Sequence, residues 1–315
     1  MKLRPIATLV AFALALFVSR VFAHGDDPQA KKEVYGKVHF KTSCTPDAQK
    51  EFEKGLAQLH SFFFPETINT FSSIPKIDPG CAIAYWGIAI SQRPNPLVGP
   101  FDAATLKRGL DAIEKGEAIG AKSQRERDWL AAMKEYFKDY ETVDQDTRTR
   151  NYEKAMAALS KKYPGDVEAK IFHALALNET FDHKSMEPLL EAIRILEPLD
   201  KKYPDHPGVT HYLIHSYDFA PIARKGIPAA DKYAKIAPSA PHAQHMPSHI
   251  YSMVGMWEDP SAPTSRRSTS AGSSAPRTGR VPERYSPRPR TRGISWSTPI
   301  CNSARMRRRS RSWRK

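Results

Sequence analysis

One spaced pattern recurs along the middle of the chain and constrains its fold more than any other feature. A residue is followed four positions later by a large apolar residue, three further by Ile or Leu, and five further by Pro. Steps of four and three put the first three positions on one face of an α-helix. The proline then ends that helix, because it has no backbone N–H to donate within it. The instances are Thr67–Phe71–Ile74–Pro79, Tyr152–Met156–Leu159–Pro164, Ala192–Leu196–Leu199–Pro204 and Ala229–Tyr233–Ile236–Pro241.

The distances between these prolines predict helix–turn–helix units. The last three prolines are 40 and 37 residues apart, and the first gap of 85 residues leaves room for one more unit. We expect that unit to hold one helix over Ala103–Ile119, an N-cap at Ser123 and a second helix from about Arg127. Each unit exposes an apolar face until a neighbour covers it, so the units must stack. The sequence predicts an all-α fold, an α-solenoid of tetratricopeptide-like repeats over residues 51–257, with an irregular helical bundle as the alternative.

The positive charge of the chain is confined to its end. The 315 residues include 48 Lys and Arg against 34 Asp and Glu, for a net charge of +14. Residues 260–315 hold 14 Arg, one Lys and one acidic residue, which leaves 33 basic and 33 acidic residues in the rest of the chain. The body is therefore neutral, and we expect no nucleic-acid partner for it.

Residues 258–315 are rich in Arg, Ser and Pro and show no apolar periodicity, so we expect a disordered tail. Such an abrupt change is also what a GC-rich gene yields when it is translated out of frame. Codons can be chosen for residues 293–315 that encode a repeat-like helical sequence in a frame shifted by two nucleotides. We therefore expect a frameshift near residues 258–260 that replaced further repeats. A basic arm for nucleic acid or anionic lipid is the alternative.

The first residues have the pattern of a signal peptide. Lys2 and Arg4 precede an apolar run that is too short to span a bilayer comfortably, and a cleavage site of small residues ends at Ala23. We expect residues 1–23 to be removed and residues 24–50 to form an N-terminal extension; a membrane anchor is the alternative. The mature chain would then have no membrane span and would be periplasmic or secreted, from a bacterium.

Export also bears on the cysteines. Cys44 and Cys81 lie in the body of the chain, and an oxidising compartment favours a disulfide between them. Two buried free thiols are the alternative.

Histidines gather where one predicted unit ends and the next begins. His211 and His215 are four residues apart on a predicted first helix, as are His245 and His249, and His242 opens the second group. Residues four apart share a helix face, so we expect the two groups to face each other across a repeat boundary. Imidazoles in such a group suit Zn²⁺, Cu²⁺ or Ni²⁺, which makes Zn or Cu the possible cofactor. The alternative is that these side chains only pack and hydrogen-bond.

First helices of stacked units line the concave groove of a solenoid, and several side chains on them are suited to contacting a ligand there. Asp218 is also a candidate metal ligand or a hydrogen-bond acceptor behind the metal. No nucleophile elbow, phosphate-binding glycine loop or Cys-x-x-Cys pair occurs, so we expect no enzyme. The residues expected to line the groove are Trp86, Tyr212, Tyr217, Asp218 and Tyr251.

Five segments carry a family resemblance: KVHFKTSC (37–44), LHSFFF (59–64), DPGCAIAYWGIAIS (78–91), HYLIHSYDFAP (211–221) and PHAQHMPSHIYSMVGMW (241–257). Together they resemble a family of largely uncharacterised exported bacterial tetratricopeptide repeat proteins, over about residues 37–257. The resemblance implies a helical-repeat fold with further C-terminal repeats and supplies no reaction. We expect a periplasmic scaffold whose groove holds a protein, a peptide or a small ligand. A metal-binding protein is the alternative.

Overall fold

The structure is a computed structural model, and it describes residues 33–256. The predictions for residues 1–23 and 258–315 lie outside this range. The described residues form helices and connecting segments, with no strand among them. The helices are α2 (Pro46–His60), α3 (Phe64–Ile77), α4 (Ala84–Ile90), α5 (Ala103–Ile119), α6 (Gln124–Phe137), α7 (Gln145–Lys162), α8 (Val167–Glu179), α9 (Glu187–Lys202), α10 (Pro207–Tyr217), η2 (Ala223–Gly226), α11 (Ile227–Ile236), α12 (Pro241–His245) and α13 (Pro247–Val254).

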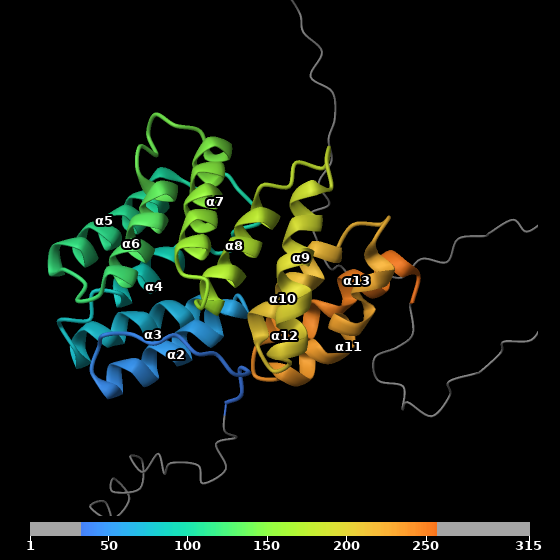
Figure 1. Cartoon of the computed structure of the whole chain (residues 1–315), viewed down its shortest axis with the longest axis horizontal. Coiled ribbons are helices and arrows are strands. Elements are labelled where there is room, and N and C mark those ends of the chain that lie inside the picture. Colours follow the sequence, from blue (N-terminus) through green and yellow to red (C-terminus); the bar gives the residue numbers. More distant parts are fainter. Residues whose placement is uncertain (1–32, 257–315) are drawn as a thin grey trace, which may run out of the picture. The chain divides into compact units, whose positions relative to one another are not determined.

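Each helix packs mainly against the next one in the chain (Figure 1). Extensive contacts join α2 with α3, α4 with α5, α6 with α7, α7 with α8, α8 with α9 and α9 with α10, and α10 also packs on α11. First helices also contact one another along the stack, as in α4 with α6 and α8 with α10. The architecture is therefore an all-α stack of helix–turn–helix units of the tetratricopeptide-like kind, as the sequence predicted.

The repeated pattern lies where it was expected. On α7 the side chains of Tyr152, Met156 and Leu159 are buried, and the helix ends before Pro164. The two helices of the extra unit and its cap are confirmed: α5 spans the predicted residues, and the Ser123 hydroxyl accepts a hydrogen bond from the Glu126 N–H at the start of α6. Their pairing is not, because α5 packs most closely on α4 and α6 on α7, so the two helices belong to different units. Helix α6 begins at Gln124, three residues earlier than predicted, because Ser123 is itself the capping residue.

The segment before α2 is an arm without helix or strand that runs along the repeats. Its backbone pairs with Asp205, where the Lys37 N–H donates to the carbonyl at 3.0 Å. Near its end, the Ser43 hydroxyl donates to the Glu126 carboxylate at 2.5 Å. Helix α2 starts at Pro46, so the expected extension over residues 24–50 ends five residues too late.

The ring of Phe40 anchors this arm in the core. It is fully buried, with its centroid 5.0 Å from that of Phe52 on α2, 6.0 Å from that of Trp86 on α4 and 5.0 Å from that of Trp129 on α6. Phe172 on α8 closes the cluster, 5.2 Å from Trp86 and 5.7 Å from Trp129. The first helices therefore meet around their own aromatic side chains, and this part of the expected open groove is filled.

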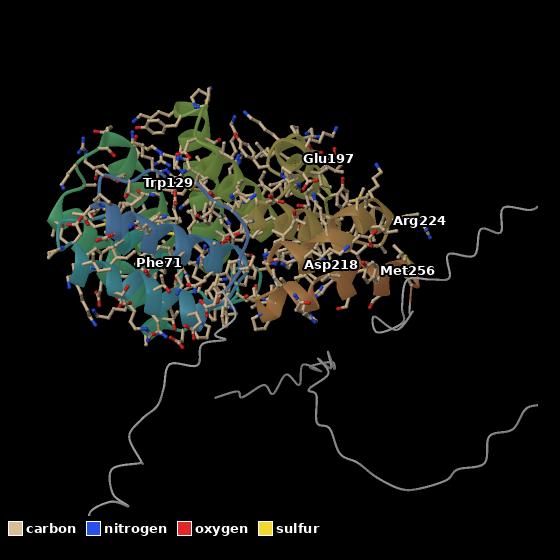
Figure 2. The ribbon with its side chains drawn as sticks, turned by 90° about the horizontal axis from the view of Figure 1, so that it is seen from below. Phe71, Trp129, Glu197, Asp218, Arg224 and Met256 are labelled. Carbon is tan, nitrogen blue, oxygen red and sulfur yellow. A yellow bond between two sulfur atoms is a disulfide. The ribbon has the colours of Figure 1, made fainter. Side chains whose placement is uncertain are left out.

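Close packing of α3 on α4 depends on a residue without a side chain. A Cβ atom at Gly87 would overlap the ring of Phe71, which is labelled in Figure 2. Phe71 is fully buried against Phe52 and Trp86 and cannot move aside without opening the core.

A disulfide joins Cys44, just before α2, to Cys81, just before α4. The Asp78 carboxylate adds a second link, accepting a hydrogen bond from the Thr45 N–H at 2.8 Å. Both links hold α2 beside the α3–α4 turn. Within residues 33–256, no helix combines the length and the apolar character needed to cross a membrane.

We expect loss of the disulfide to destabilise the protein. The bridged residues are 37 apart in sequence. In the chain-entropy model, closing a loop of that length raises the free energy of the unfolded chain by about 4 kcal/mol. The variant Cys44→Ser/Cys81→Ser should lower the free energy of unfolding by about 2–4 kcal/mol in urea denaturation. Equal stability of this variant and the oxidised protein would contradict the prediction.

Candidate functional site

The five histidines predicted from the sequence come from three helices. Helix α10 carries His211 and His215, α12 carries His242 and His245, and α13 carries His249. One nitrogen atom from each of His211, His215 and His242 lies within 4.8 Å of the other two. The repeat boundary therefore brings three imidazoles together at the spacing of ligands around one ion.

The backbone carbonyl at the end of α2 determines which ring nitrogen of His211 carries the proton. Its Nδ1 lies 2.6 Å from the His60 carbonyl oxygen, which can only accept, so Nδ1 carries the proton. In the neutral ring Nε2 then carries the lone pair, and it lies 3.0 Å from Nε2 of His215, from which it can accept a hydrogen bond. This is the arrangement of metal-binding histidines, in which one ring nitrogen donates to a carbonyl and the other faces the ion.

The second pair has the same arrangement. Nδ1 of His249 donates to the Asp218 carboxylate at 2.7 Å, and Nε2 of His249 lies 3.0 Å from Nε2 of His245. Asp218, labelled in Figure 2, follows the last residue of α10. It therefore acts as the acceptor behind a histidine, one of the two roles predicted for it.

His242 lies between the two pairs. Its ring centroid is 4.9 Å from that of His211 and 6.0 Å from that of His245, and its Nε2 is buried without a hydrogen-bond partner. Burial, and then the neighbouring histidines, lower the pKa of His242 to about 4. Burial also holds the pKa of His211 and His215 well below the ordinary value. The three rings are neutral near pH 7, which is the form that binds metal.

The ring of Phe62 packs against the three imidazoles of this group. Its ring centroid lies 4.5 Å from that of His211, 5.7 Å from that of His215 and 5.3 Å from that of His242. Its backbone is in the left-handed region, with φ of 50°, which costs a residue with a side chain roughly 1–2 kcal/mol. A strained bulky residue beneath a cluster of imidazoles is typical of a functional site.

The remaining predicted groove residues do not form a ligand surface. Trp86 and Tyr212 are fully buried and Tyr217 nearly so, so these three predictions are wrong: the first helices pack on one another and cover them. The hydroxyl of Tyr217 donates to Glu197 at 2.6 Å, and that of Tyr251 donates to Asp231 at 2.7 Å. Burial is the main reason why the pKa of both phenols is raised.

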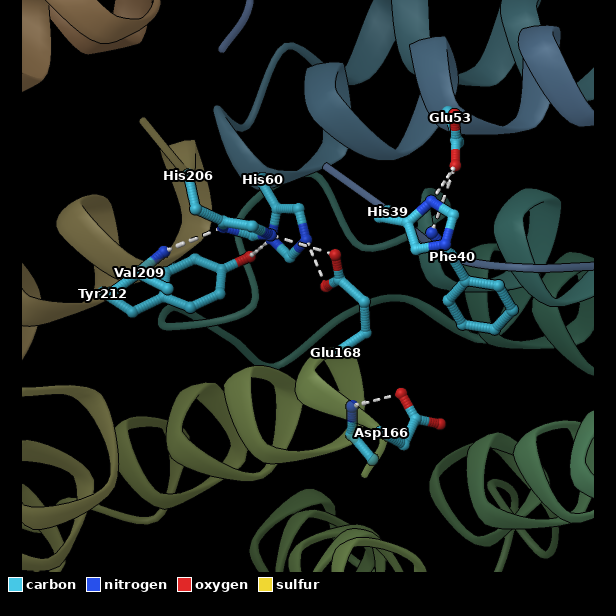
Figure 3. A network of polar contacts seen from close by, with 10 residues as sticks. His39, Phe40, Glu53, His60, Asp166, Glu168, His206, Val209 and Tyr212 are labelled. Carbon is cyan, nitrogen blue, oxygen red and sulfur yellow. Dashed lines mark hydrogen bonds and ion pairs between the residues drawn. The ribbon is translucent and has the colours of Figure 1, made fainter. Parts of the chain in front are cut away.

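A second histidine cluster was missed by the sequence analysis (Figure 3). The carboxylate of Glu168, on α8, accepts from Nε2 of His60 at 2.8 Å and from Nε2 of His206 at 2.9 Å, and all three side chains are buried. Despite its burial, the pKa of Glu168 is held well below the ordinary value by the two histidines. His206 follows a Tyr-Pro pair, as the helix-capping Asp166 does 40 residues earlier. The shared position predicts that His206 caps a helix, but it does not predict that His206 binds the carboxylate of Glu168.

The cluster around Glu168 is saturated. Nδ1 of His206 accepts the Val209 N–H at 3.3 Å, and Nδ1 of His60 pairs with the Tyr212 hydroxyl at 3.0 Å (Figure 3). Both nitrogens of each ring therefore have hydrogen-bond partners. No lone pair is left for an ion, although the three residues are close enough to hold one. The cluster joins α2, α8 and α10 and has a structural role.

A cavity of about 930 Å³ opens beside this cluster. Its walls are the arm, the start of α6 and the turns that precede α8 and α10. Glu168 and His206 lie on its inner side. The lining residues are Lys37, Val38, His39, Lys41, Thr42, Ser43, Ser123, Arg125, Lys162, Tyr163, Pro164, Gly165, Asp166, Val167, Glu168, Tyr203 and His206.

Fold and site together define a class: an all-α helical-repeat protein with a histidine array at one repeat boundary. No protein-family model and no curated protein matches the chain. A solved structure with some likeness is that of YrrB, described as a TPR protein with an unusual peptide-binding site. The alignment has 16% sequence identity and a TM-score of 0.32, and it covers 63% of this chain and 91% of that one. At this TM-score the likeness supports no conclusion about function.

We expect Glu168→Gln to destabilise the protein in a pH-dependent way. A carboxylate whose pKa is lowered in the folded state stabilises it above the unfolded value of 4.5, and this contribution is lost as the pH falls below that value. The variant should lose about 1–3 kcal/mol at pH 7, and the difference from the wild type should narrow towards pH 3.5. Urea denaturation across this range measures it.

Glu153→Gln is the matched control, because Glu153 pairs with a single histidine, His173, at a partly exposed position. Its effect should stay below about 1 kcal/mol. A loss for Glu168→Gln that does not change with pH would show that the charge of the carboxylate is not the stabilising feature.

Proposed function

We propose that this protein binds a transition-metal ion through His211, His215 and His242. The observation that carries the proposal is the distance of 3.0 Å between two Nε2 atoms, with a third imidazole nitrogen within 4.8 Å. Two imidazole nitrogens bound to Zn²⁺ at about 2.0–2.1 Å with a tetrahedral angle lie roughly 3.3 Å apart. The Nε2 atoms of His211 and His215 are thus within a few tenths of an ångström of this separation, and the nitrogen of His242 lies within 4.8 Å of both.

The donor set favours one class of metal. Three neutral imidazoles suit Zn²⁺ or Cu²⁺, whereas Ca²⁺ and Mg²⁺ require oxygen ligands. The carbonyl of His60 behind His211 supplies the outer hydrogen bond that orients such a ligand. With three protein ligands, a fourth position stays open for water or another donor.

We place this protein in the periplasm or outside the cell. The Cys44–Cys81 disulfide supports an oxidising compartment, and the signal-like pattern of residues 1–23 agrees with it. In an oxidising compartment thiols are oxidised, so a metal site there is best built from other ligands. The proposed ligands meet this condition because they are all imidazoles.

We expect purified protein without a His-tag to bind Zn²⁺ or Cu²⁺ in isothermal titration calorimetry. Saturation at about 100 times the dissociation constant should stabilise the fold by about 2.7 kcal/mol, measured as a rise in melting temperature. The variants His211→Ala and His215→Ala should each weaken binding by at least tenfold.

His39→Ala is the control, because His39 is highly exposed and pairs only with Glu53 and not with another histidine. It should bind metal like the wild type. Unchanged binding by both His211→Ala and His215→Ala, or a melting temperature that neither metal raises, would overturn the proposal.

A second function, binding of a peptide or small ligand, is supported by the cavity beside the arm. Its volume of about 930 Å³ falls in the range of small-ligand pockets. Tyr163 and Tyr203 offer aromatic surface, while Lys41 offers positive charge for an acidic group. This site replaces the predicted concave groove as the place where a scaffold of this kind would hold its partner.

We expect Gly165→Phe to abolish such binding without unfolding the protein. Gly165 lines the cavity, and a Cβ atom at this position meets no atom within 4 Å, so a large side chain can be added there without a clash at its base. A displayed library of short peptides, selected against the wild type, should give sequences that the variant fails to bind. Gly165→Ala is the matched control and should bind them. Equal enrichment on Gly165→Phe would exclude this cavity.

A further inference from the structure

We infer that His245 and His249 hold a second transition-metal ion next to the first, so that the repeat boundary is a two-metal site. This inference rests on the proposed function of the first group and adds a second ion with its own ligands. It also assigns Asp218 the role of orienting His249 rather than that of a ligand.

The two pairs are built alike. In each, two histidines four residues apart point their Nε2 atoms at each other at 3.0 Å. In each, one Nδ1 is held by a strong acceptor, the His60 carbonyl for His211 and the Asp218 carboxylate for His249. A carboxylate behind a histidine is the usual outer partner in metal sites, and it raises the basicity of the ligand.

A hydrogen bond alone explains the second pair poorly. His245 is exposed and the His249 side chain is about a third exposed, so an imidazole–imidazole hydrogen bond there competes with water. Holding two rings in this position costs side-chain entropy that such a bond does not offset. Binding of a metal ion offsets this entropy cost, because the two nitrogen ligands are already in place and one of the rings is already oriented.

The two positions lie side by side but differ in access to solvent. The ring centroid of His215 is 6.3 Å from that of His249, and His242 is 6.0 Å from His245. In the first group His211 is buried and His215 and His242 are partly buried, whereas in the second His245 is exposed and His249 is partly buried. The outer ion therefore has only two protein ligands and keeps positions open for water or for a donor from another molecule, such as a carboxylate. It binds more weakly and exchanges faster than the inner ion.

The test uses the full chain with Zn²⁺ alone. Zn²⁺ bound per chain is measured after equilibrium dialysis, and its release is followed with a coloured chelator. The wild type should bind two ions and release them in a fast and a slow phase. The variant His245→Ala/His249→Ala should bind one ion, lose the fast phase and keep the slow one, and His39→Ala should match the wild type. Circular dichroism verifies that each variant is folded.

Each other outcome overturns the inference in a recognisable way. One ion per wild-type chain, lost when either pair is replaced, indicates a single five-histidine site and leaves the proposed function standing. Two ions that survive His245→Ala/His249→Ala place the second ion elsewhere. Absence of bound Zn²⁺ from the folded wild type overturns both the inference and the proposed Zn²⁺ site. Asp218→Asn, which keeps the shape but weakens the acceptor, should speed the fast phase at least tenfold, and an unchanged rate excludes its orienting role.

Discussion

Insertion of the N-terminal arm and α2 against the first helices is the contact on which the rest of the structure depends. An isolated stack of helix pairs leaves an apolar face along its inner side. Here Phe40 and Phe52 cover that face together with Trp86, Trp129 and Phe172. Each buried aromatic ring contributes on the order of 2–3 kcal/mol from burial. The Cys44–Cys81 disulfide keeps α2 in place, so the groove is filled by the protein's own side chains.

The same insertion builds the histidine array. Helix α2 ends at His60, and the carbonyl of this residue sets the tautomer of His211, while Phe62 two positions later supports the three imidazoles from below. Docking of α2 therefore also positions the imidazole rings of the array. On the proposed function, an ion at His211, His215 and His242 would strengthen the contact of α2 with α10 and α12. Metal binding would then depend on the packing of these helices.

The two histidine clusters show how the surroundings decide their chemistry. Around Glu168 every ring nitrogen already has a partner, so His60 and His206 serve to bury a carboxylate and join three helices. In the array, no carboxylate lies among the first three rings, and His242 keeps a nitrogen without a partner. Histidines in close contact thus form a structural cluster in one place and a candidate ligand set in the other. The difference is the supply of hydrogen-bond partners.

The sequence by itself determined the helices and their order, because apolar spacing, capping residues such as Ser123 and closing prolines such as Pro164 are local signals. It also determined that His211 and His215 share a face, because both lie on α10 and helix geometry fixes residues four apart. His245 and His249 were expected on one helix, but the structure places them on two short helices, α12 and α13. Only the tertiary structure decided what lies opposite them. The arm and α2 join residues about 150 positions away, as in the bond of His211 to His60, and no local pattern encodes such a contact. For that reason Trp86 and Tyr212, expected to line a groove, are core residues, and Glu168 and Phe62 were found only in the folded chain.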